Sequence, residues 1–155
     1  MLSLKYSKDS DLLAKLTEEV QNIHHQIAPD KFKPFDQKSF KLYFKKSLAQ
    51  KDSFAIIVYK NEEPIGYISY QITEVNENAY SNSYSFINLN HIAILDRFKR
   101  NGYAKQLISK LKEIAVSQNI DTISLSQWTK NTEAGEFFKQ IGFKQYRQHL
   151  ELKSI

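Results

Sequence analysis

A long apolar strand that runs directly into a glycine turn and an amphipathic helix is the feature that most constrains this fold. The strand is predicted over residues 84–95, YSFINLNHIAIL. The helix is predicted from apolar residues that recur at helical spacing from Ala104 to Ala115. Gly102 stands at the helix entrance and is one of four glycines in the chain. This order of strand, turn and helix indicates a sheet with helices packed on its faces.

The turn that joins this strand to this helix is suited to binding phosphate. The first N–H groups of a helix lack intrahelical partners, and the helix dipole favours an anion there. Gly102 permits close approach of a ligand, and Ala104 keeps the next turn unobstructed. Lys99, Arg100 and Lys105 add positive charge at the rim. The residues alone leave a second interpretation open, which is a solvated basic turn with a glycine for conformational reasons.

The remaining hydrophobic patterns predict a single α/β (α+β) domain over residues 1–155. The expected architecture is a mixed central sheet flanked by helices, in the order β-α-α-β-β-β-α-β-α-β. Asp9 or Ser10 is expected to cap the first helix. The other expected strands cover residues 2–7, 53–60, 65–73, 121–128 and 143–152, and the other helices contain residues 12–23, 40–48 and 131–141.

Composition narrows the class of protein. The absence of cysteine excludes disulfides, thiolate catalysis and cysteine-ligated metals, and no metal is expected. The N-terminal residues lack the apolar segment of a secretory signal, and the longest apolar run, Phe54–Tyr59, is too short to cross a bilayer. We therefore expect a cytoplasmic domain that does not associate with membranes. The net charge of +5 favours an anionic ligand, although no motif typical of nucleic-acid binding is present, and nucleic acid is not an expected partner.

Two motifs and the order of elements resemble the GNAT superfamily of acyl-CoA-dependent N-acetyltransferases. The family pattern Arg/Gln-x-x-Gly-x-Gly/Ala corresponds to residues 99–104, KRNGYA, with lysine at the first position. The family pattern Asn-x-x-Ala-x-x-Phe-Tyr-x-x-x-Gly-Phe corresponds to residues 131–143, NTEAGEFFKQIGF. The resemblance covers the whole chain in layout and is most specific over residues 84–146.

The resemblance implies a site for acetyl-CoA, used as the acyl donor. In the family the fourth strand splays from the fifth, and its freed main-chain groups pair with the pantetheine amides, while the glycine turn holds the diphosphate. An asparagine at the start of the last helix hydrogen-bonds the CoA arm, and here it is also a candidate helix cap. The residues implied to bind CoA are Ile92, Ala93, Ile94, Lys99, Arg100, Asn101, Gly102, Tyr103, Ala104, Lys105, Asn131 and Phe138.

The groups that carry the chemistry are less evident. Without cysteine, direct attack of the amine in a ternary complex is favoured over an acyl-enzyme thioester. The Ile94 N–H is the expected oxyanion donor. Many family members have a glutamate base on the fourth strand, where this chain has Asn88, Asn90 and His91, so His91 and Asn90 are the catalytic candidates. The alternative for His91 is a hydrogen-bonded structural histidine. Phe138 replaces the family's tyrosine acid.

The acceptor side carries no motif that names the amine. His24 and His25 lie late in the first predicted helix, where the family shapes its acceptor pocket, and Trp128 follows the fifth predicted strand. The alternatives are surface histidines and a core tryptophan. The aromatic residues expected to pack in the core or in a homodimer interface are Phe40, Tyr43 and Phe44.

The function predicted from these observations is transfer of an acetyl group from acetyl-CoA to a primary amine of a small molecule, peptide or protein. Two alternatives stay open. One is a catalytically weak acyl-CoA-binding module that senses or recruits, since the family's usual glutamate and tyrosine are missing. The other is a basic nucleic-acid-binding domain, for which affinity would fall steeply with salt.

Overall fold

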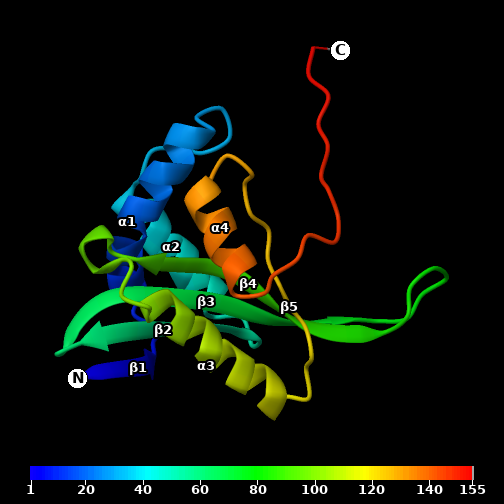
Figure 1. The fold of residues 1–155 in the computed structure, drawn as a ribbon, viewed down its shortest axis with the longest axis horizontal. Helices are drawn as coiled ribbons and strands as arrows, with labels where there is room; N and C mark the ends of the chain where they lie inside the picture. The colour runs from blue at the N-terminus through cyan, green and yellow to red at the C-terminus, as the bar shows by residue number, and fades with distance from the viewer. Residues whose placement is uncertain (155) are drawn as a thin grey trace.

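A five-stranded sheet with helices on both faces forms the domain in the computed structural model, which describes residues 1–154 (Figure 1). The strands follow one another in chain order across the sheet, all antiparallel to their neighbours except the last pair, which is parallel. The elements are β1 (Leu2–Tyr6), α1 (Ser10–Ile27), α2 (Gln37–Ser47), β2 (Ser53–Lys60), β3 (Glu63–Val75), β4 (Tyr84–Ile94), the 3₁₀ turn η1 (Asp96–Phe98), α3 (Tyr103–Ser117), β5 (Ile123–Ser124) and α4 (Thr132–Gln140).

The two faces of the sheet carry separate hydrophobic cores. Alternation along β2 directs Ile56 and Val58 to the face covered by α3 and α4, and Ala55 and Ile57 to the face covered by α1 and α2. Because both faces are covered, β2 and β3 are apolar on both sides, and alternation is weak in their sequence. Within α3 the buried residues are Leu107, Ile108, Leu111 and Ala115, as the stripe predicted.

Side-chain caps fix the starts of three helices. Asp9, one of the two expected caps, accepts a hydrogen bond from the Leu12 N–H at the start of α1. Asp36 accepts from Ser39 at the start of α2, and Asn131 accepts from the Ala134 N–H at the start of α4. A cap of this kind stabilises a helix by about 1 kcal/mol.

A one-residue bulge in β4 changes which side chains face which core. Leu89 is opposite Tyr70 and His91 is opposite Ser69, so Asn90 is the extra residue. Leu89, before the bulge, packs on the α3 side, whereas Ala93, after it, packs on the α1–α2 side. A strand without the bulge would place both on one face. The bulge therefore turns His91 toward α1 and α2.

One predicted strand is shorter than expected, and another is not formed. The strand expected over residues 121–128 is limited to β5, because the chain diverges from β4 after Ser124. The final strand, expected over residues 143–152, is not formed within the part of the chain that the structure describes. Residues 144–154, which we call the C-terminal arm, instead extend away from the sheet, and ion pairs of Glu151 and Lys153 hold the tip beside the α1–α2 loop (Figure 1). Alternation predicts an extended conformation, but a strand also needs a neighbour with which to pair.

Candidate active site

The edge of β4 that faces β5 is open over the second half of the strand. The pairing of β4 with β5 is confined, in residues 1–154, to Ile87 with Ile123 and Asn88 with Ser124. Beyond this point the two strands splay apart, so residues 89–94 of β4 have a sheet neighbour on the β3 side alone. The splay implied by the family resemblance is therefore present.

Main-chain groups of Ile92 and Ile94 point into this open edge. The Leu95 N–H donates to the Ile65 carbonyl at 2.9 Å, which places the Leu95 amide on the β3 side. The Ala93 carbonyl also faces β3, because a Cβ on Gly66 would stand 2.3 Å from it. Since successive residues of a strand direct their N–H and C=O groups to opposite edges, those of Ile92 and Ile94 face outward. Ala93, expected to join them, is directed toward β3.

The turn that follows presents unpaired N–H groups at the start of α3. Gly102 caps the helix with φ 80° and ψ 6°, and no side chain of the described residues caps it. No atom lies within 4 Å of the Cβ that Gly102 lacks, so the space above it is open. Arg100 also adopts a positive φ, 62°. Two left-handed residues so close together curve the backbone around a common point, as anion-binding turns do.

The positively charged side chains around this turn differ in how far other side chains already neutralise them. The Lys99 ammonium lies 2.7 Å from a carboxylate oxygen of Asp96 and 4.0 Å from one of Glu133. Its charge is therefore partly neutralised, and the contact with Glu133 joins the turn to the start of α4. The side chains of Arg100 and Lys105 are exposed. Asn101 donates to two turn carbonyls, those of Phe98 and Lys99, and so supports the loop.

Helix α4 brings the second motif to the same side of the sheet. The Asn131 oxygen is engaged by the Ala134 N–H, which confirms the expected cap and leaves its amide N–H₂ group for a ligand. Phe138 is partly buried, with its ring centroid 5.5 Å from that of Phe143. Phe138 packs on the same core as Tyr103 and Ala104 of α3. The residues predicted to bind CoA are thus gathered around the splay and the start of α3.

The predicted acceptor residues form an aromatic cluster around Phe32. The His24 ring stacks on Phe32 with centroids 4.8 Å apart, and Trp128 meets Phe32 edge-on at 5.1 Å. His24 and Trp128, which are remote in sequence, are therefore brought together. His25 lies beside them, but its Nδ1 bonds to the Phe32 carbonyl at 2.8 Å, a contact that supports the loop.

His91 is the candidate base, but its surroundings lower its basicity. Burial, together with a smaller effect of the neighbouring His24, lowers the pKa of His91 to about 4. The ring is therefore neutral at pH 7 and is a weak proton acceptor. The Tyr43 hydroxyl lies 3.2 Å from the His91 Nε2. Burial raises the pKa of Tyr43, so this hydroxyl keeps its proton at neutral pH.

Two residues of this region were not singled out by the sequence. The sequence predicts that Tyr43 packs in a core or an interface, yet its hydroxyl contacts His91, and no sequence pattern points to Phe32. Phe32 lies in the loop between α1 and α2, where periodicity carries no information. Asn90, exposed at the bulge, receives a hydrogen bond from the Asn88 amide.

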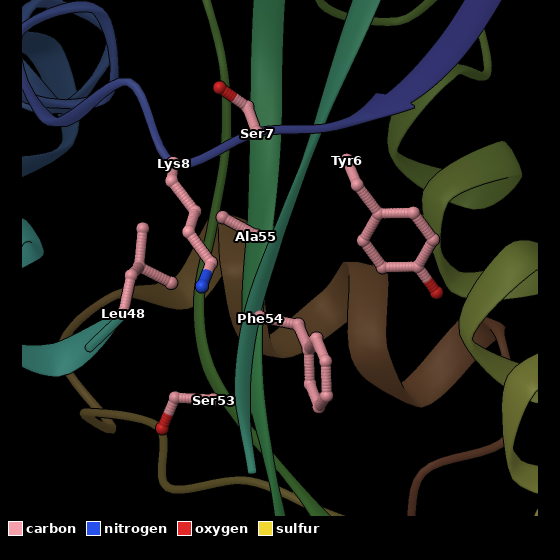
Figure 2. A pocket seen from close by; sticks show the side chains of 7 residues that line it. All are labelled: Tyr6, Ser7, Lys8, Leu48, Ser53, Phe54 and Ala55. Atoms are coloured by element: carbon pink, nitrogen blue, oxygen red, sulfur yellow. The ribbon is translucent and has the colours of Figure 1, made fainter. Parts of the chain in front are cut away.

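Residues 1–154 contain no cluster of three or more potential metal ligands, and no helix among them combines the length and apolarity needed to span a membrane. A surface hollow of about 360 Å³ lies at the other end of the strand order, between β1, β2 and the end of α2 (Figure 2). Lys8 points into it, but it shares no residue with the candidate site.

Comparison with known proteins identifies the family. Residues 20–143 match the model of the acetyltransferase (GNAT) family. This chain belongs to that family. The GNAT fold is also found by superposition on solved structures. A tetramutant of the BH1408 protein from Bacillus halodurans aligns with a TM-score of 0.92 at 14% identity, covering 98% of this chain and 99% of that one.

Two other GNAT structures resembling this chain contain CoA or acetyl-CoA. Aminoglycoside N-acetyltransferase AAC(6')-Iy in complex with CoA has a TM-score of 0.70 at 16% identity, with 99% of this chain and 95% of that chain covered. A predicted acetyltransferase from Clostridium acetobutylicum with acetyl-CoA has a TM-score of 0.74 at 20% identity, with 99% and 96% covered. At these identities the likeness concerns the fold.

Proposed function

We propose that this GNAT protein transfers an acetyl group from acetyl-CoA to a primary amine by direct attack. The observation that carries the proposal is the continuity of the open β4 edge with the uncapped start of α3. A strand edge with outward N–H and C=O groups suits the two amides of pantetheine. The helix start with Gly102 suits the diphosphate. One ligand that carries both groups in this order is acetyl-CoA.

The chain's own groups are suited to different parts of the reaction. In the transfer a C–N bond forms and the C–S bond breaks, the amine loses a proton and the CoA thiolate gains one. The Ile94 N–H, directed to the open edge, is placed to donate to the acyl oxygen. A lysine-like amine has a pKa of about 10.4 and is protonated at neutral pH, so the chain or a water molecule must take a proton from it. His91, Asn90 and Tyr43 lie on or against β4 and are candidates for positioning that water.

The acceptor is proposed to lie near His24, Phe32 and Trp128. Their rings offer an apolar wall, and the faces of aromatic rings attract cations such as an ammonium group. His25 supports this wall through the loop carbonyl. The proposal therefore favours a cationic amine over an anionic one.

A second candidate function is supported by two absences in the sequence. Asn88 and Asn90 replace the carboxylate base common in GNAT proteins, and Phe138 replaces the tyrosine acid. An acyl-CoA-binding module with slow or no turnover would need neither group.

Turnover separates the two candidates. The protein is incubated with acetyl-CoA and a panel of polyamines, aminoglycosides, amino acids and peptides, and free thiol is followed together with the mass of the acetylated amine. We expect thiol release that depends on one class of amine and is lost in Gly102→Asp. Binding of acetyl-CoA without amine-dependent thiol release would support the binding module and contradict the transferase.

A further inference from the structure

The surface hollow between β1, β2 and the end of α2 is lined mainly by apolar side chains (Figure 2). Its volume of about 360 Å³ lies at the small end of the range for ligand pockets. The apolar walls are formed by Tyr6, Leu48, Phe54 and Ala55. The rings of Tyr6 and Phe54 meet edge-on with centroids 6.2 Å apart, and Tyr6 is 59% exposed. The hollow therefore offers an aromatic and aliphatic surface to a ligand of small size.

Lys8 is the charged residue of this hollow, and its side chain points into it (Figure 2). Within residues 1–154 no carboxylate lies close enough to the Lys8 ammonium to form an ion pair. Lys5, the neighbouring cation on β1, instead lies over the Tyr59 ring, 5.2 Å from its centroid. A lysine whose aliphatic stem borders apolar walls keeps its ammonium for a polar partner. Lys8 therefore supplies an unpaired positive charge to an otherwise uncharged hollow.

Ser53, at the start of β2, adds a polar group to the wall of the hollow. It is only 5% exposed, yet its hydroxyl has no hydrogen-bond partner among the described residues. A buried hydroxyl usually has such a partner, because its removal from water otherwise costs free energy. The Ser7 hydroxyl accepts from the Asp9 N–H. The Tyr6 hydroxyl lies 3.3 Å from that of Tyr70. The Ser53 hydroxyl is therefore the one left to hydrogen-bond a ligand.

We propose that this hollow binds a small carboxylic acid whose body is a single ring or a short alkyl chain. The carboxylate pairs with the Lys8 ammonium, the body lies against Tyr6 and Phe54, and the Ser53 hydroxyl bonds a polar atom of the ligand. One unpaired cation among apolar walls suits a monoanion. A phosphate group, with more charge and more oxygens, needs more donors than the hollow offers. The hollow shares no residue with the candidate active site, so the proposal does not depend on acyl transfer.

The first test titrates isotope-labelled native protein with phenylpropionate and follows the backbone amide signals by two-dimensional NMR. We expect saturable shifts centred on Lys8, Ser53 and Phe54, with the signals of Gly102 and Asn131 unmoved. Phenylpropionamide, which has the same shape without the charge, should bind roughly fivefold more weakly, the effect of one ion pair in a partly exposed site. N-acetyl-glycyl-phenylalanine carries a similar ring and carboxylate at the end of a peptide, and it should bind no better than the free acid.

The second test repeats the titration on variants. Lys8→Met keeps the aliphatic stem and removes the charge, so it should weaken binding of phenylpropionate roughly fivefold and leave that of phenylpropionamide unchanged. Lys8→Arg should restore most of the affinity. Ser53→Ala should weaken binding roughly threefold, as loss of one hydrogen bond does. Lys51→Met, an exposed cation that does not line the hollow, is the matched control and should bind as the native protein does.

Several results would overturn this assignment. They are the absence of saturable shifts, shifts centred away from the hollow, or equal binding of phenylpropionate by the native protein and Lys8→Met. Equal binding of the acid and the amide would show that the hollow selects only for an apolar body. Tighter binding of the peptide than of the free acid would assign the hollow to a peptide end. None of these measurements involves CoA or thiol release, so the carboxylate site and the proposed transferase fail independently.

Discussion

Gly102 is the residue on which the proposed CoA site depends most directly. Its φ of 80° favours glycine, and the open space at its missing Cβ leaves room for a phosphate. We predict that Gly102→Asp weakens CoA binding at least tenfold, because a carboxylate at the helix start repels the diphosphate. Titration calorimetry with CoA measures the change.

The control for this prediction is Gly102→Asn. Asparagine adopts a left-handed backbone more readily than most other residues with a side chain. It also has the shape of aspartate without its charge. If the two variants bind CoA equally weakly, the side chain blocks access and charge is not the cause. If Gly102→Asp binds CoA as the native protein does, residues 99–104 are only a basic turn.

Phe138 tests the placement of the second motif. We predict that Phe138→Tyr changes CoA affinity by no more than a few-fold. The added hydroxyl can protonate the departing thiolate, so kcat should rise only if departure of the thiolate limits turnover. Loss of a fully buried phenylalanine ring costs about 3–5 kcal/mol in the free energy of unfolding. Phe138→Ala should cost less than this, because the ring is partly exposed. Urea unfolding and steady-state kinetics measure both. A harmless Phe138→Ala would mean that the motif is misaligned.

The lowered pKa of His91 predicts a specific dependence of stability on pH. The unfolded chain binds a proton at His91 near pH 6.5, whereas the folded protein does so near pH 4. Stability from the neutral ring is therefore complete above pH 6.5 and is lost as the pH falls toward 4, by up to about 3 kcal/mol. His24, whose pKa burial also lowers, contributes in the same direction.

The measurement is the free energy of unfolding between pH 7 and pH 4.5 for the native protein and for His91→Gln. The variant is expected to show a clearly smaller loss, because one of the titrating groups has been removed. His149→Gln, in the exposed arm, should keep the native slope. Parallel curves for the native protein and His91→Gln would mean that His91 titrates normally in the fold.

At the scale of elements, the close approach of β3 and β4 supports the open edge. A Cβ at Gly66 would stand 2.3 Å from the Ala93 carbonyl oxygen and 2.6 Å from the Ile94 Cδ1. We predict that Gly66→Ala displaces β4 at Ile94, destabilises the fold by a few kcal/mol, as overpacking does, and reduces acetyl-CoA binding. Chemical unfolding and calorimetry measure the two effects.

Gly135 in α4 is the matched control. A Cβ there would meet its nearest atoms, those of the flexible Gln127 side chain, at 3.4 Å. An alanine in a helix is favoured over glycine by about 0.5–1 kcal/mol, so Gly135→Ala should be close to neutral or stabilising. A Gly66→Ala variant as stable as Gly135→Ala would show that β4 adjusts freely.

The elements also show what sequence reasoning could reach. Helix α3 was predictable because its apolar stripe has one period throughout, and α4 because Asn131 and Gly142 mark its ends. The bulge at Asn90 was not, since one extra residue in an apolar strand leaves no mark on the pattern. The contact between Tyr43 and His91 depends on that bulge and was missed with it.

The arm shows a different limit. Its alternation correctly indicates an extended segment, but alternation does not say whether a neighbouring strand is present to pair with it. The same contrast between features local in sequence and features built from distant segments holds for the proposed sites. Most of the residues proposed to bind CoA are local to one turn and one strand, so their proximity was predictable, whereas the proposed acceptor cluster joins α1, a loop and the segment after β5.

At the scale of the whole molecule, the two halves of the proposed site should act together on stability. A ligand that binds the native state alone adds RT ln(1 + [L]/Kd), about 2.7 kcal/mol at a hundredfold excess over Kd. For a chain of this size that corresponds to a rise in melting temperature of roughly 5–10 °C. We predict this rise with acetyl-CoA and with CoA, measured by differential scanning fluorimetry.

Fragments of CoA, used in the same experiment, test the two halves of the proposed site separately. Pantetheine can use only the open edge of β4, and ADP only the start of α3, so each alone should raise the melting temperature less than CoA does. Raising the salt concentration should weaken the effect of ADP and leave that of pantetheine, because only the former depends on charge. A protein that binds nucleic acid would instead respond to oligonucleotides with a steep loss at high salt. No shift with millimolar CoA would contradict the assignment of both halves of the site, whatever the acceptor amine.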